Sequence, residues 1–202
     1  MIGGLLIAPM NAPAQTSAGL NTAVTNVDAP STYITAQQRL HWFVTSTIGP
    51  TSLSAGLFSA AFSTASNTPS EYGPHWAGYA KRYGMRLTGI STGNAMEAGL
   101  GALWGEDPRY FREPEEPIKV RIGHAIKTTF TAYDREGNVV PAYARCIAIP
   151  GNNFLSNTWR ADSEANTRSA AMRTLYGFLG KMGSNAFTEF WPDLKKLAFH
   201  RH

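Results

Sequence analysis

Two residues carry the side chains that acid–base catalysis uses most. Glu97 is the only charged residue between Leu87 and Gly105, and His124 is one of five histidines. A carboxylate in apolar surroundings and an imidazole can both exchange protons near neutral pH. Glu97 and His124 are therefore the candidate acid and base if the chain is an enzyme. Otherwise, Glu97 is paired with a cation, lines a polar cavity or is solvated.

Three cations could bind an anion. Lys81, Arg82 and Arg109 would together suit a phosphate or a lipid headgroup. We favour a structural interpretation of the loop 107–111. In it, the aspartate accepts from backbone amides, the arginine pairs with a carboxylate, and the aromatic rings enter the core.

Other chemical patterns are incomplete. Residues 89–93 match the G-x-S-x-G pattern of hydrolases, which needs a strand before the serine, but both flanks here favour helix. No two histidines have the spacing of a helical zinc motif, and Cys146 is the only cysteine. We therefore predict no metal and no cofactor. One alternative is a metal site that Glu97, His124 and Glu189 would form only when the chain folds, which their spacing in the sequence cannot show.

The elements that position these residues are expected to be helices. Thr35 and Gln38 give a capping-box signal, and Gly49–Pro50 interrupts the stretch that follows. The expected helices cover 35–48, 52–65, 74–104, 115–133, 141–149 and 163–190. The first two should form a helical hairpin, and no strand is predicted. The fold class is mostly α, a bundle of about five to six helices with glycine-rich, closely packed faces.

Small residues recur on two of these helices. Gly89, Gly93 and Gly101 share one face of the third, and Gly177, Gly180 and Gly183 lie on the last. Such faces let helix backbones approach closely, so we expect these two helices to pack on each other. Glu97 lies on the same face and would need a cation, for which Arg173 and Lys181 are the candidates.

The charged residues are unevenly distributed. Through residue 80 they are only Asp28, Arg39 and Glu71. Charged residues make up 16% of the chain, and the formal net charge is +4. An apolar half beside a basic half is typical of a protein that lies on an anionic membrane surface. Because the basic residues are interleaved with acids, a nucleic-acid partner is not expected.

The chain begins like a targeting sequence. An apolar run at 3–10 precedes Ala12-Pro13-Ala14, which resembles a signal-peptidase site. We therefore expect export, with cleavage after about residue 14. The predicted organisation is a signal-like start and spacer at 1–33, a helical domain at 34–193, and a basic tail at 194–202.

Three segments follow one another in a specific order. They read GYAKRYG at 78–84, DPRYF at 107–111 and NAFTEF at 185–190. In these motifs the chain resembles a family of exported, helix-rich bacterial envelope proteins to which no activity is assigned. It departs from that family at Ala80, where glycine is usual, and lacks a Tyr-Tyr-Pro near Trp159. The resemblance implies an envelope location and a helical fold, and it supplies no catalytic residue.

The expected function is that of an exported, membrane-associated helical protein of the envelope, structural or lipid-interacting. Its partners would be a membrane lipid surface and, in addition, a second copy or an envelope complex. Two alternatives stay open. One is an envelope enzyme acting on lipid or glycan through Glu97 and His124. The other is a soluble periplasmic bundle.

Overall fold

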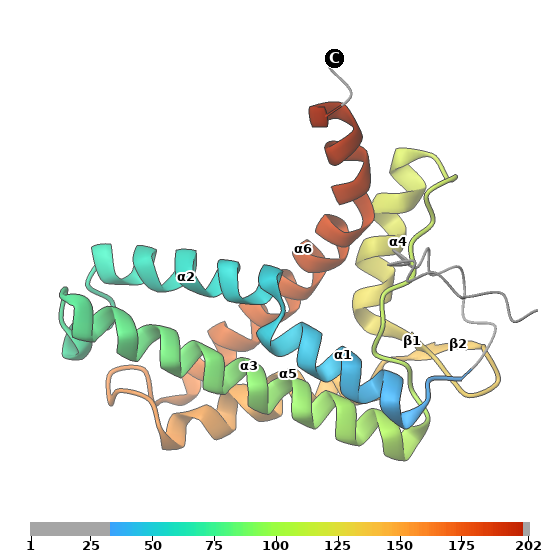
Figure 1. The fold of residues 1–202 in the computed structure, drawn as a ribbon. Helices are drawn as coiled ribbons and strands as arrows, with labels where there is room; N and C mark the ends of the chain where they lie inside the picture. The colour runs from blue at the N-terminus through green and yellow to red at the C-terminus, as the bar shows by residue number, and fades with distance from the viewer. Residues whose placement is uncertain (1–32, 200–202) are drawn as a thin grey trace, which may run out of the picture.

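The computed structural model describes residues 33–199, and the fold is mostly α-helical, as the sequence predicts (Figure 1). The helices are α1 Ala36–Ile48, α2 Pro50–Ala65, α3 Trp76–Trp104, α4 Ile118–Phe130, α5 Tyr143–Leu155 and α6 Thr167–Phe199. A two-stranded sheet joins α4 to α5, with β1 at Thr131–Tyr133 and β2 at Val139–Pro141. The predicted signal-like start lies outside the described residues, and so does most of the spacer.

Helices α1 and α2 run end to end along α3, in the opposite direction (Figure 1). The Thr35 capping box starts α1, and Gly49 both ends α1 and precedes α2. Near the start of α1, Arg39 donates to the Ala98 carbonyl. In the middle of α2, a Cβ on Gly56 would touch Tyr83. The predicted helical hairpin is therefore wrong, because Gly49–Pro50 bends the chain without reversing it.

Helix α3 packs along α5, and α5 packs along α6. The expected direct pairing of the third and last helices is wrong, because α5 is the neighbour of both. Gly93 approaches Asn152 of α5, and Gly177 approaches Ile149 of α5. Small residues thus serve close packing, but against α5. Of the other predicted packing glycines, Gly101 approaches Arg39 and the Glu106 carbonyl, whereas added Cβ atoms on Gly89, Gly180 and Gly183 would meet nothing within 4 Å.

Two prolines lie inside helices that the sequence predicted to end there. Helix α5 continues through Pro150 to Leu155, and α6 continues through Pro192 to Phe199. A proline removes one backbone donor and crowds the preceding turn. Packing of the flanking turns outweighs that cost, and Asn152 Nδ2 donates to the Gly89 carbonyl just beyond Pro150.

The β1–β2 hairpin replaces the predicted end of the fourth helix. Helix α4 stops at Phe130, and its expected acidic first turn precedes the helix instead, since Ile118 is its first residue. The Asp134 carboxylate accepts from the amides of Glu136 and Asn138, which closes the predicted turn between the strands. Three-residue strands are too short for alternation of side chains to reveal them in the sequence.

The helices form two limbs that share α6 (Figure 1). The long limb contains α1, α2, α3, α5 and the first half of α6. The short limb contains α4 and the second half of α6, which rise together away from the rest. The loop 106–117 connects α3 of the long limb to α4 of the short limb.

Candidate functional site

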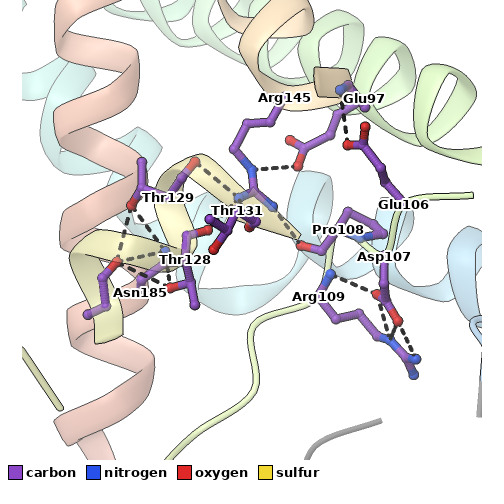
Figure 2. A network of polar contacts seen from close by, with 12 residues as sticks. Glu97, Glu106, Asp107, Pro108, Arg109, Thr128, Thr129, Thr131, Arg145 and Asn185 are labelled. Atoms are coloured by element: carbon purple, nitrogen blue, oxygen red, sulfur yellow. Dashed lines mark hydrogen bonds and ion pairs between the residues drawn. The ribbon is translucent and has the colours of Figure 1, made fainter. Parts of the chain in front are cut away.

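The junction of the two limbs is built around the guanidinium of Arg145 (Figure 2). Arg145 Nε donates to Glu97 Oε1 at 2.8 Å, and both residues are buried. Its Nη1 donates to the carbonyls of Thr128 and Thr129 at the end of α4. Its Nη2 donates to the Pro108 carbonyl at 3.3 Å. One arginine of α5 therefore ties together α3, α4 and the connecting loop.

The prediction that Glu97 pairs with a cation is confirmed, but the predicted cations are wrong. Arg173 instead donates to the carbonyls of Glu164 and Asn153. Lys181 lies over the Trp42 ring, and burial lowers the pKa of its ammonium group to about 8. Arg145 had a signal in the sequence, because it is the only charged residue of α5 just as Glu97 is alone in its stretch of α3.

Glu106 lies beside this ion pair. Its Oε2 accepts from the Ala144 amide at 3.0 Å and so caps the N-terminus of α5. Its Oε1 is buried and has no hydrogen-bond partner in the part of the chain that the structure describes. Burial raises the pKa of the Glu106 carboxyl, and the charge of Glu97 adds to the rise. The backbone amides in the first turn of α5 and the positive charge of Arg145 act in the opposite direction and lower this pKa.

A small pocket at the junction is lined by carboxylates, Arg145 and small residues. The lining residues are Glu97, Gly101, Glu106, Asp107, Pro108, Ala132, Ala144 and Arg145. The pocket leaves no room even for a water molecule. As it stands, this is a packed polar centre that cannot admit a substrate.

The loop 107–111 has the structural role that the sequence favoured. Asp107 is buried, and its carboxylate accepts from both the backbone amide and the guanidinium of Arg109. Phe111 is buried against the edge of the Tyr133 ring. Tyr110 donates through its hydroxyl to Glu189 Oε2 at 2.9 Å. The DPRYF and NAFTEF segments therefore meet inside the protein.

The short limb has its own buried centre around Glu189, which is fully buried. Arg121 of α4 donates to Glu189 Oε1 at 2.7 Å and to Asp193 Oδ2 at 2.6 Å. Burial and the hydrogen bond to Glu189 raise the pKa of the Tyr110 hydroxyl. The hydrogen bond from Arg121 lowers the pKa of Asp193. No spacing in the sequence identified Arg121.

Asn185, the first residue of NAFTEF, also serves packing. Its buried Nδ2 donates to the Ala125 carbonyl at 3.2 Å and to the Thr129 hydroxyl at 3.3 Å. This side chain joins the two helices of the short limb at a level between Arg121 and Arg145.

The candidate acid and base are not brought together. His124 Nδ1 lies 3.0 Å from Glu113 Oε1, and its Nε2 lies 2.9 Å from the Phe111 carbonyl. Glu97 belongs to the Arg145 network instead. Glu97 therefore lies apart from the other two, whereas Glu113 links His124 to Glu189, since its carboxylate contacts His124 and its backbone amide donates to Glu189 Oε2 at 3.3 Å. No metal-binding cluster of three such residues occurs among residues 33–199.

The three cations of the expected anion clamp are also separated. Arg82 is buried and donates to the carbonyls of Pro69 and Gly73 at 2.7 Å each, so it closes the turn between α2 and α3. Lys81 is exposed on the same turn of α3. Arg109 follows the opposite end of this helix, about 30 Å away at 1.5 Å per residue. No clamp forms, because α3 is a single straight element.

Compared with an ordinary soluble helical bundle, the distribution of side chains is inverted: charged side chains are buried and large apolar side chains are exposed. The buried apolar residues are mainly alanines, whereas Arg39, Arg82, Arg121, Arg145, Glu97 and Glu189 are buried. Large apolar side chains are exposed along the helices. They include Leu40, Val44 and Ile48 on α1, Leu57, Phe58 and Phe62 on α2, Ile147 and Phe154 on α5, and Met172, Leu175 and Leu179 on α6.

These exposed faces carry little charge. Helix α2 has no charged residue, and the only ones in α1 and α5 are Arg39 and Arg145, both buried. On α6, the exposed positions 172, 175, 176 and 179 follow helical spacing and form an apolar stripe. A contiguous apolar surface of this kind marks a site of contact with protein or lipid.

No described helix is both long enough and apolar enough to cross a membrane. No protein-family model, curated protein or solved structure matches the chain.

Proposed function

We propose that the chain is an exported, membrane-associated protein of the cell envelope, structural or lipid-interacting, which contacts lipid through the apolar outer faces of its long limb. The observation that carries this proposal is the inverted distribution of side chains. Phe58 and Phe62 are each 78% exposed, while the charged residues Arg145 and Glu97 are buried and paired.

Lipid explains this inversion physically. In water, leaving a phenylalanine exposed forgoes about 1.5–3 kcal/mol of burial energy. Against acyl chains, large apolar side chains are solvated on the outside, and helices associate through small residues and polar contacts. Helix α5 meets its neighbours in this way, through Gly93, Gly177 and the ion pair of Arg145.

The envelope location and the export signal remain proposals from the sequence, and the resemblance to exported envelope proteins supports them. N-terminal sequencing of the protein from its native cell should begin after about residue 14. An intact Met1 on protein from the cytoplasm would contradict export.

Vesicle flotation tests the lipid contact. Purified chain should float with phosphatidylcholine vesicles, and it should do so at high salt, because apolar contact is not screened. The double variant Phe58→Ser/Phe62→Ser should partition at least about a hundredfold less, since each removed ring contributes more than about 1.4 kcal/mol, a factor of ten. The control is Ser59→Ala, an exposed polar position on the same helix.

Two outcomes would favour the alternatives. A wild-type chain that stays monomeric without detergent and ignores vesicles would be a soluble bundle. A chain that ignores vesicles but forms a defined oligomer would use the same faces for a second copy. The enzyme alternative has no geometric support, because Glu97 and His124 belong to different networks.

A further inference from the structure

Among residues 33–199, Glu106 is the one residue lining the junction pocket that has a buried side-chain oxygen without a hydrogen-bond partner. The residue is only 4% exposed, and its Oε2 accepts from the Ala144 amide. Glu106 lines the junction pocket, and its Oε1 has no hydrogen-bond partner among the described residues. A buried polar atom without a partner usually costs free energy, so its persistence calls for an explanation.

Cations of α1 and α5 lie near Glu106, but each is held elsewhere. Arg145 of α5 donates to Glu97 and to backbone carbonyls. Arg39 of α1 donates to the carbonyl of Glu106 itself and not to its carboxyl group.

The remaining neighbours do not neutralise it either. Asp107 is paired with Arg109, and Arg135 of the hairpin lies over the Tyr33 ring. Cys146 follows Arg145 on α5, and burial together with the charges of Glu106 and Glu97 raises the pKa of its thiol. No cation within the described residues forms an ion pair with the Glu106 carboxylate.

The size of the pocket limits what could satisfy Oε1. It leaves no room for a water molecule, and a metal ion would need several oxygen ligands at more than about 2 Å. A proton is the one cation that needs no space of its own.

We propose that Glu106 is a proton-binding site of the limb junction, which takes up a proton from solvent on Oε1 while Oε2 continues to accept from the first turn of α5. One O–H bond forms on uptake and breaks on release, and nothing is oxidised or reduced. The bound state places a neutral carboxyl beside the charged Glu97, and the free state places two carboxylates beside one arginine (Figure 2).

Proton release should loosen the junction. Arg145 links Glu97 to the last carbonyls of α4, so a second carboxylate competes for the same guanidinium. Because burial raises the pKa of Glu106 in the folded state, its contribution to stability is present below the unfolded pKa. That contribution is lost as the pH rises through the higher folded value.

Carbon-13 NMR of glutamate carboxyl groups tests the proposal on the full chain in detergent. One signal, absent from Glu106→Gln, should titrate with a midpoint above the ordinary glutamate value of about 4.3. The matched control, Asp193→Asn, removes a partly exposed carboxylate of the short limb and should leave that midpoint unchanged. A Glu106 signal that titrates at or below the ordinary value would overturn the proposal.

A second variant covers the case in which Glu106→Gln fails to fold. Glu97→Gln removes the neighbouring negative charge and frees Arg145, so it should lower the Glu106 midpoint. An unchanged midpoint would show that the two carboxyl groups do not share the site, and it would also overturn the proposal. This test does not measure vesicle binding, so its result neither supports nor contradicts the proposed lipid contact.

Discussion

The two ends of α4 are held by two buried arginines in different ways. At its start, Arg121 meets two carboxylates, those of Glu189 and Asp193. At its end, Arg145 meets one carboxylate and several backbone carbonyls. Glu189 also accepts from the Tyr110 hydroxyl, so it keeps a partner of its own.

The two centres differ in whether every buried carboxylate oxygen has a hydrogen-bond partner. In the short limb, each oxygen of the Glu189 carboxylate accepts a hydrogen bond, and Asp193 reaches solvent. At the junction, Glu106 retains an unpaired oxygen, and the pocket that it lines has no room for a water molecule. Buried polar groups that are fully satisfied specify a structure, whereas a partly satisfied one can respond to its surroundings.

Loss of the junction arginine should have the largest effect. Arg145→Met leaves Glu97 as a buried charge without a partner, which typically costs about 3–5 kcal/mol. Thermal melts in detergent should show the loss. Adding Glu97→Leu should restore only part of it, because the carbonyls at the end of α4 still lack their donor. Full restoration would mean that Arg145 serves the ion pair alone.

Loss of Arg121 should cost less, about 2–3 kcal/mol for its charged hydrogen bonds. Glu189 would still accept from Tyr110, and Asp193 can be solvated. Arg121→Met should therefore melt at a higher temperature than Arg145→Met in the same detergent. The reverse order would refute the distinction between the two centres.

Two glycine substitutions should act in opposite directions. A Cβ on Gly101 would lie 2.8 Å from Arg39 Nη1 and 3.1 Å from the Glu106 carbonyl, so Gly101→Ala should destabilise by about 1–3 kcal/mol. A Cβ on Gly123 of α4 would meet nothing within 4 Å, so Gly123→Ala should stabilise by up to about 1 kcal/mol. Urea or thermal unfolding measures the change in stability of each variant. Changes of the same sign in both would contradict the close packing around Gly101 at the junction.

The smallest expected effect is a different response of the two centres to acid. Arg121 lowers the pKa of Asp193, so this contribution persists until the pH falls below the ordinary range of aspartate. The raised pKa of Glu106 instead makes the junction more stable as the pH falls from neutral. Amide hydrogen exchange, corrected for intrinsic rates, should show greater protection of residues 128–131 at pH 4.5 than at pH 6.5. The protection of residues 189–193 should change little between these two pH values. An equal change in both segments would contradict the predicted difference between the two centres.

Local signals sufficed for several elements. The Thr35 capping box, the Gly49–Pro50 interruption and the end of α3 at Gly105, with φ of 80°, lie where the sequence predicts them. Each depends on residues a few positions apart, so neighbouring side chains determine the outcome. The isolation of Glu97 likewise predicted a cationic partner.

The identity of that partner depended on the fold. Glu97 and Arg145 are 48 positions apart, and only the packing of α3 along α5 brings them to 2.8 Å. The same packing keeps α5 helical through Pro150. The sequence alone determined helices with polar and small residues on one side. Which sides meet was decided by the tertiary structure, because burying a charge is tolerable only where the fold supplies its partner.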